Sequence, residues 1–186
     1  VLRPKGGDPF MPGPGGAESQ ALAKAKIPLP IVPGTTAGAG GLAYAGIPVT
    51  HRDINQTVTF LTGHDQNGLM LDAIDWDAVA KGSPVIVMYM AMKHIDGIAQ
   101  SLMKAGRRAD EPLAFVCNAA TGAQQVLEST IGTAAADAAA SGLEPPAIIV
   151  VGEVVRLRAG LDWLGQRQGR VLEADPLQRL PVRDAG

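Results

Sequence analysis

Short apolar runs alternate along this chain with segments whose apolar residues recur at helical spacing. Val85–Met90 and Ala147–Val151 are unbroken apolar runs, which is typical of strands buried on both faces of a sheet. Thr57–Thr62 is rich in β-branched residues and therefore also favours a strand. Similar patterns predict three more strands: a buried one at Ile27–Val32, ended by Pro33-Gly34, and others at Leu113–Cys117 and Gln125–Thr130.

Helical segments separate these strands along the sequence. Ile95–Ala105 has apolar residues three and four positions apart, which predicts an amphipathic helix. Thr36–Ala45 consists mainly of small residues, so we expect a helix that packs closely against a neighbour. Other helices are expected at Ala17–Lys26, Asp75–Lys81 and Thr133–Ala140. The alternation of strands and helices indicates an α/β fold, whereas the polar tail after Arg158 is expected to fray.

Composition and charge exclude several classes of protein. Of the 186 residues 46% are hydrophobic and 18% charged, so the chain can bury a core and is not of the disordered class. A net charge of −2 and an aromatic content of 4% argue against a nucleic-acid partner. No apolar run approaches the length of about 18 residues that a membrane span needs.

The single cysteine and the first residue lead to two further predictions, about the cellular compartment and about the start of the chain. Cys117 cannot form an internal disulfide, which fits a reducing compartment, and we expect a cytoplasmic protein. Its apolar neighbours favour a buried, inert thiol. The chain begins at Val1 rather than at a methionine, so we expect an N-terminal part to be missing.

Two glycine-rich stretches are candidates for binding. Gly6 and Gly7 would expose backbone N–H groups next to the Asp8 carboxylate, which suits a ligand with hydroxyls or a positive centre; a simple turn is the alternative. Gly38–Ala43 matches the dinucleotide pattern G-x-G-x-x-A, but the acidic residue expected about 20 positions later is absent. Close packing of a helix explains the second stretch better.

Metal and hydrolase chemistry find little support. The three histidines, His51, His64 and His94, have no zinc-ligand spacing, so no metal site is predicted. The G-x-S-x-G motif of a hydrolase nucleophile is also missing from the sequence.

Four basic residues lie at the expected loop edges: Arg3, Lys5, His51 and Arg52. Arginine in particular can bind a carboxylate through two parallel hydrogen bonds. The set could therefore receive an acidic substrate, but a solvated surface explains it equally well.

Six motifs follow one another in the chain: Arg3–Phe10 (R-P-K-G-G-D-P-F), Val32–Ala37 (V-P-G-T-T-A), Ala43–Arg52 (A-Y-A-G-I-P-V-T-H-R), Thr62–His64, Tyr89-Met90 and Val151–Val155. Their order and spacing, from Val1 to about Gly165, resemble the uroporphyrinogen-III C-methyltransferases of the tetrapyrrole methylase superfamily. The K-G-G-D-P-F and G-I-P-x-T-H-R stretches together distinguish this family from most other methylases of the same fold.

The resemblance implies two α/β domains with the cofactor in the cleft between them. The first domain, incomplete, would be 1–48, the second 49–165, and a tail would follow at 166–186. The implied cofactor is S-adenosylmethionine, which leaves as S-adenosylhomocysteine. The implied activity is C-methylation of uroporphyrinogen III to precorrin-2 for cobalamin or sirohaem synthesis, by a homodimer.

Site residues are carried over by the same resemblance. The implied cofactor contacts are Gly6, Gly7, Asp8, Met11, Thr36, Ala37, Met90 and Ala119. Because the implied substrate carries many carboxylates, the basic set of Arg3, Lys5, His51 and Arg52 gains weight as its receiver. No catalytic residue is identified. The family's G-P-G-D-type loop is absent, and Ala119 stands where the family usually has glycine.

Two alternative functions stay open. The chain could be a non-catalytic cofactor-binding or dimerisation module, or it could be a related precorrin methyltransferase with another acceptor. The G-I-P-x-T-H-R stretch argues against a change of substrate. Turnover of uroporphyrinogen III would separate the leading interpretation from both alternatives.

Overall fold

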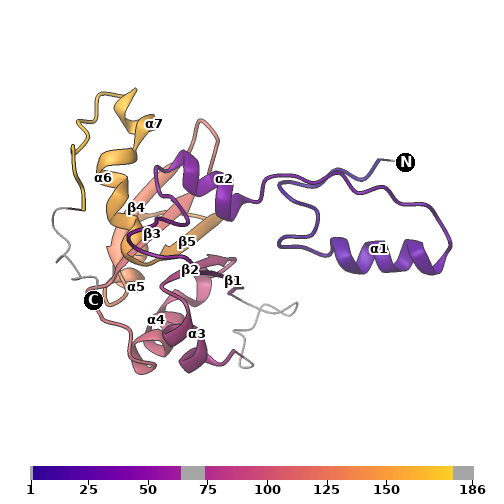
Figure 1. The fold of residues 1–186 in the computed structure, drawn as a ribbon, viewed down its shortest axis with the longest axis horizontal. Helices are drawn as coiled ribbons and strands as arrows, with labels where there is room; N and C mark the ends of the chain where they lie inside the picture. Colours follow the sequence, from indigo (N-terminus) through magenta and orange to yellow (C-terminus); the bar gives the residue numbers. More distant parts are fainter. Residues whose placement is uncertain (1, 64–73, 178–186) are drawn as a thin grey trace.

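A mixed five-stranded sheet organises residues 2–63 and 74–177, which are the residues that this computed structural model describes (Figure 1). The strands are β1 (Val58–Thr62), β2 (Val85–Tyr89), β3 (Pro112–Cys117), β4 (Gln125–Thr130) and β5 (Ala147–Val151), in the order β1-β2-β5-β3-β4. β1 and β2 are parallel, whereas β5 runs antiparallel to both of its neighbours. The ends of β2 and β3 therefore meet the start of β5 at one edge of the sheet.

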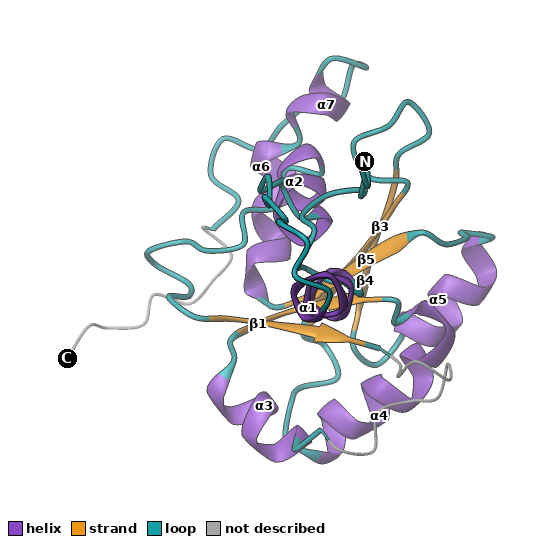
Figure 2. Ribbon diagram, turned by 90° about the vertical axis from the view of Figure 1, so that its right-hand side faces the viewer, coloured by secondary structure: helices purple, strands orange, loops and turns teal. Residues whose placement is uncertain are grey.

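Helices lie on both faces of this sheet (Figure 2). One side carries α2 (Ala37–Tyr44), α6 (Arg158–Leu161) and α7 (Trp163–Gln166); the other carries α3 (Trp76–Gly82), α4 (Ile95–Lys104) and α5 (Ala134–Ser141). Short 3-10 turns, η1 (Met92–His94) and η2 (Glu153–Leu157), follow β2 and β5. This arrangement confirms the predicted α/β class. No helix of the described ranges is long and apolar enough to cross a bilayer.

Alternate residues of the central strands feed two separate cores. On β2, Val85 and Val87 face α2 and pack with Leu42, whereas Ile86 and Met88 face α4. All five residues of β2 are buried, which confirms the strand predicted to be buried on both faces. The two-residue period of a strand thus assigns each side chain to one core or the other.

The N-terminal segment departs from the predicted pattern. Helix α1 (Gly15–Lys24) is present, but it lies on an arm that extends away from the sheet (Figure 1). The buried strand predicted at Ile27–Val32 is wrong: these residues form no strand, and Val32 is 82% exposed. Prolines at 28, 30 and 33 remove the N–H donors that a buried strand would need.

The C-terminal segment is more ordered than its polar composition suggested. Fraying after Arg158 is wrong for residues up to 177, because Arg158 and Asp162 are both buried and paired at 2.8 Å. Arg170 also bonds Asp162 at 2.8 Å. Burial by itself raises the pKa of Asp162, but the Gly165 N–H and the two guanidinium groups outweigh it, so the net pKa is lowered. The last predicted tail residues, 178–186, lie outside the described residues.

The expected division at residue 48/49 stays a prediction. Helix α2 lies on the N-terminal side of that boundary, yet its Leu42 packs in the same core as Val85 and Val150 of the sheet. A boundary drawn there would separate a helix from the strands on which it packs.

We expect Asp162→Asn to lower the free energy of unfolding at pH 7 by about 3 kcal/mol, since it leaves the buried Arg158 guanidinium with only the half-exposed Glu128 carboxylate. The folded pKa of Asp162 is lowered, so its contribution is complete above the unfolded value of 3.8 and is lost as the pH falls through the folded value. Urea unfolding at pH 7, 5 and 3 should therefore show a shallower acid loss in the variant.

Asp77→Asn, at an exposed carboxylate on α3, is the control and should leave the wild-type profile unchanged. Parallel profiles for wild type and Asp162→Asn would contradict this account.

Candidate functional site

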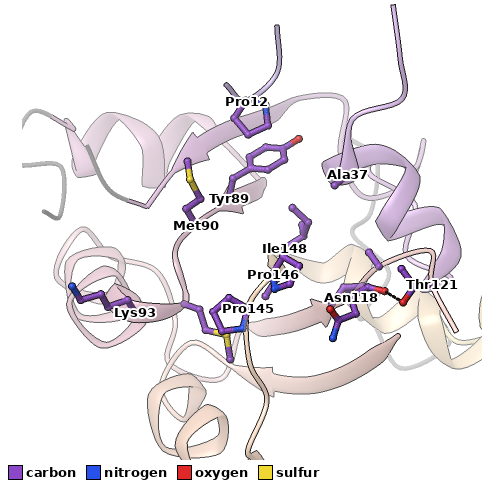
Figure 3. Close-up of a pocket in the computed structure, with 14 residues that line it drawn as sticks. Pro12, Ala37, Tyr89, Met90, Lys93, Asn118, Thr121, Pro145, Pro146 and Ile148 are labelled. Carbon is purple, nitrogen blue, oxygen red and sulfur yellow. Dashed lines mark hydrogen bonds between the residues drawn. The ribbon is translucent and has the colours of Figure 1, made fainter. Parts of the chain in front are cut away.

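A cavity of roughly 530 Å³ opens at the sheet edge where β2 and β3 end and β5 begins (Figure 3). This volume is in the range of small-molecule sites. Most of the lining is apolar, and Asn118, Thr121 and Lys93 add polar groups. The full lining consists of Pro12, Ala37, Tyr89, Met90, Met92, Lys93, Val116, Asn118, Ala119, Thr121, Pro145, Pro146, Ala147 and Ile148.

Two non-glycine residues, one directly after β2 and one directly after β3, have a positive φ, which such residues rarely adopt. Met90 has φ 52° and Asn118 has φ 48°, and both residues line the cavity. The Asn118 N–H donates to the Pro146 carbonyl at 2.9 Å, and the Thr121 hydroxyl donates to the Asn118 carbonyl at 2.8 Å (Figure 3). Such conformations persist where the surroundings fix them and cluster at ligand sites.

The hydroxyl of Tyr89 joins three segments next to the cavity. It lies 2.6 Å from Thr36 Oγ1 and accepts the Gly38 N–H at 3.1 Å. Thr36 Oγ1 donates to the Met11 carbonyl at 3.1 Å, so the Tyr89 hydroxyl must donate to Thr36. This chain of hydrogen bonds ties the N-terminal loop and the first turn of α2 to the end of β2.

Close backbone approach explains the glycines of α2. A Cβ on Gly38 would lie 2.3 Å from the Tyr89 hydroxyl, and a Cβ on Gly41 would lie 2.7 Å from the Ala119 Cβ. These contacts confirm that Gly38–Ala43 is a close-packing stretch.

Asp8 closes its own loop. Its carboxylate accepts the Phe10 N–H at 2.8 Å and the Gly34 N–H at 3.2 Å. A Cβ on Gly34 would lie 2.2 Å from the Gly7 carbonyl oxygen, so the two loops touch through their backbones. The carboxylate thereby holds residues 6–10 against residues 34–36.

The eight residues expected to contact the cofactor fall into two groups. Ala37, Met90 and Ala119 line the cavity. The others form the paired loops beside it, which reach the cavity wall through Thr36 and Tyr89: Gly6, Gly7, Asp8, Met11 and Thr36. The second group supports the wall of the cavity without lining it.

The two basic residues near the N-terminus, Arg3 and Lys5, both form ion pairs with Glu18 of α1. Lys5 Nζ and Arg3 Nη2 lie 2.6 and 3.2 Å from the Glu18 carboxylate. Their hydrogen bonds, with Lys5 contributing most, lower the pKa of Glu18. Both cations are therefore placed on the arm and outside the cavity lining.

The second basic pair lies in the turn before β1. The His51 N–H donates to Asn55 Oδ1 at 3.0 Å, and His51 Nδ1 accepts the Asp53 N–H at 3.3 Å. Arg52 is exposed. His51 thus closes its own turn, and neither residue of the pair lines the cavity.

Tyr89, Asn118 and Lys93 are among the cavity residues that the sequence did not assign to the site. Tyr89 belongs to the Tyr89-Met90 family motif, but it lies inside an apolar run and was given no role in the site. Asn118 follows a buried strand, and asparagine is enriched at positive φ, which is a usable signal. Lys93 comes three residues after Met90 on η1, with its ammonium group pointing away from the other labelled residues (Figure 3).

Cys117 is buried at the end of β3, and burial raises the pKa of its thiol, so the predicted buried thiol is confirmed. Within 2–63 and 74–177, the histidine, cysteine and carboxylate side chains form no group of three that could hold a metal. His64 lies outside the described residues.

A family profile for tetrapyrrole (corrin/porphyrin) methylases matches residues 1–135. The chain therefore belongs to the tetrapyrrole methylases.

Within that family, the chain is 64% identical to a uroporphyrinogen-III C-methyltransferase of Sinorhizobium sp, over 99% of this chain and 66% of that protein. It is 42% identical to the siroheme synthase of Zymomonas mobilis, over 90% of this chain but 35% of that protein. The chain thus spans slightly less than two thirds of the first relative and about a third of the second.

A solved structure agrees with this assignment. The uroporphyrin-III C-methyl transferase of Thermus thermophilus, complexed with S-adenyl homocysteine, superposes with a TM-score of 0.73 at 32% identity. The match covers 84% of this chain and 67% of that chain. The fold of the described residues is that of this enzyme class.

We expect Gly38→Ala to destabilise the fold by about 2 kcal/mol, because the added methyl would displace the Tyr89 hydroxyl and overpack the contact. This loss would exceed the gain of about 1 kcal/mol in helix propensity. Urea unfolding of both proteins measures the difference.

Gly16→Ala in α1 is the matched control, since a Cβ there meets nothing within 4 Å. It should be neutral or slightly stabilising. A Gly38→Ala protein as stable as wild type would show that α2 does not touch β2 as described.

Proposed function

We propose that this chain takes part in the S-adenosylmethionine-dependent C-methylation of uroporphyrinogen III to precorrin-2. The observation that carries the proposal is the apolar cavity at the ends of β2 and β3, whose lining includes Ala37, Met90 and Ala119. These are three of the residues that the family resemblance assigns to the cofactor. The name of the relative at 64% identity and the ligand of the Thermus structure support the same activity.

The cavity residues fit S-adenosylmethionine. Gly38 and Gly41 let the backbone of α2 lie directly against the end of the sheet, where a side chain would fill the space. The apolar lining suits an adenine ring, and the polarizable Met90 thioether suits a ring face or a sulfur. Asn118 and Thr121 add hydrogen-bonding groups that can orient a ligand.

When bound, S-adenosylmethionine would supply an electrophilic methyl group on a sulfonium centre. The residues of this chain would bind and orient it: Ala37 and Ala119 form apolar walls, and the Tyr89 hydroxyl holds the first turn of α2 in place. Such positioning contributes strongly to a transfer that requires alignment of the attacking carbon with the methyl group. A base that removes the ring proton is not assigned.

The acidic substrate would need cations near the cavity. Lys93 lies in its lining. Arg3, Lys5, His51 and Arg52 remain proposed receivers of its carboxylates, on surfaces outside that lining. We further propose that the protein acts in the cytoplasm as a homodimer and serves the cobalamin or sirohaem pathway.

A cofactor-binding module without turnover is the second candidate. It is favoured by Ala119, which adds a methyl group to the cavity wall where the family usually has glycine, and by the position of Gly6–Asp8 in loops beside the cavity. Binding alone would fit both candidates, whereas turnover would exclude this one.

We expect calorimetric titration of S-adenosylhomocysteine into the 186-residue chain to give saturable binding at one site. Ala37→Phe should weaken binding roughly tenfold or more, because the ring would occupy the cavity. Ala78→Phe is the control: it places the same ring at an exposed position of α3, outside the cavity lining.

A folded chain that does not bind S-adenosylhomocysteine would overturn the proposal. If binding is observed, methyl transfer from S-adenosylmethionine to uroporphyrinogen III, followed by the absorbance of the oxidised product, decides between enzyme and module. Transfer to a different precorrin alone would assign the chain to a related methylase.

A further inference from the structure

The C-terminal end of α2, opposite the end that lines the cavity, is held by side chains from other parts of the fold. Three successive backbone carbonyls, at residues 43–45, each accept a hydrogen bond from a side chain. The donors are, in that order, Trp163 Nε1 at 3.0 Å, Gln124 Nε2 at 3.2 Å and Arg158 Nη1. Carbonyls at the end of a helix need such partners because the helix itself leaves them under-bonded.

Two packing contacts reinforce these hydrogen bonds. The rings of Tyr44 and Trp163 lie 5.4 Å apart, measured between their centroids. Gly46 has φ 71°, and a Cβ on it would lie 2.4 Å from the Leu161 carbonyl oxygen. The turn after α2 therefore lies directly against the junction of α6 and α7.

We call the three donors Trp163, Gln124 and Arg158 the clamp, and its Arg158 is fixed to the sheet. Arg158 pairs with Asp162 at 2.8 Å and with Glu128 of β4 at 3.1 Å. Arg170 closes the network through both of these carboxylates. Arg158 is thus a buried donor fixed by carboxylates on both sides, whereas Trp163 and Gln124, which are more exposed, reach the end of α2 from the surface.

Helix α2 needs external support. It has eight residues, three of them glycine, whereas isolated helices need about 12–15 good helix formers to be even marginally stable. At about 1.5 Å per residue, the helix is only about 12 Å long, so a displacement of one end also displaces the other. Its other end is the cavity wall at Ala37 and the Gly38 N–H bound to Tyr89.

We propose that Trp163, Arg158 and Gln124 are positioning residues, which hold the C-terminal end of α2 and thereby fix its first turn at the cavity. The identity of the ligand rests on the function proposed above, whereas the coupling between the two ends of α2 does not. A small shift of the first turn would disturb both the Tyr89 hydrogen bond and the wall at Ala37. Misplacement of binding groups by about 1 Å is enough to lower activity strongly.

Trp163→Phe tests the link with little disturbance, because it keeps an aromatic ring against Tyr44 and removes the indole N–H. Hydrogen exchange of the Gly38 amide, followed by NMR on the full chain, reports on the cavity end of α2 without any ligand. We expect exchange at Gly38 to be roughly five- to tenfold faster in the variant, and S-adenosylhomocysteine to bind roughly three- to tenfold more weakly. The first turn would then depend on a contact made at the opposite end of the helix.

Arg158→Gln and Arg107→Gln form a matched pair that separates positioning from general loss of stability. Arg107 does for α3 what Arg158 does for α2: it donates to the carbonyls of Ala80 and Ser83 and pairs with Glu111. Helix α3 is not part of the cavity lining. Only Arg158→Gln should speed exchange at Gly38 and weaken ligand binding.

Unchanged Gly38 exchange in both Trp163→Phe and Arg158→Gln would overturn the inference, as would an equal effect of Arg107→Gln. If the wild type binds and Ala37→Phe abolishes binding while Trp163→Phe binds normally, the positioning role fails and the proposed function stands. If the wild type does not bind, the proposed function fails, and the Gly38 exchange rate still decides whether the clamp fixes the first turn.

Discussion

The contact between the first turn of α2 and the end of β2 is the constraint on which the site depends. The Tyr89 hydroxyl needs the Gly38 N–H at 3.1 Å, and there is no space for a side chain at that position. Once the helix lies this close, Thr36 can bond both Tyr89 and the Met11 carbonyl, which brings the N-terminal loop to the same place. A hydroxyl buried in an otherwise apolar run thus organises segments that are far apart in the sequence.

The sheet supplies the rest of the site through its mixed topology. Because β5 runs antiparallel between β2 and β3, its first residues lie at the edge where those strands end. The chain leaves both strands in positive-φ conformations, at Met90 and Asn118, so these residues turn at the cavity instead of continuing the strand. The apolar walls from β5 and the residues after β2 and β3 come together for this reason.

Local patterns predicted those parts of the fold that depend on local physics. Val85–Met90 and Ala147–Val151 could be identified as buried strands because burial on both faces requires an unbroken apolar run. Ile27–Val32 has a similar composition, but its prolines lack the N–H donors that pairing in a sheet requires, and the run is exposed. Order after Arg158 was not predictable from polarity, because burial makes a network of its charges. Arg158 and Asp162 are only four residues apart, but Glu128 and Arg170 join them only in the folded chain.

The same distinction applies to the candidate site. Ala37, Met90 and Ala119 were carried over from a family resemblance, and they line the cavity. Tyr89 was missed because its role depends on a hydroxyl that meets a helix 51 residues away in sequence. The roles of Trp163 and Arg158 were out of reach for the same reason, since their acceptors are backbone carbonyls, which carry no sequence signal.

The central place of β5 also has a consequence for how the protein comes to be made. The strand is the last of the five in the sequence, yet it lies between β2 and β3 and is hydrogen-bonded to both. During translation, β1 with β2 and β3 with β4 can pair as two separate halves, but no strand of the described sheet joins them until β5 has been made. Both core layers therefore stay incomplete until β5 is made, and that strand completes them together.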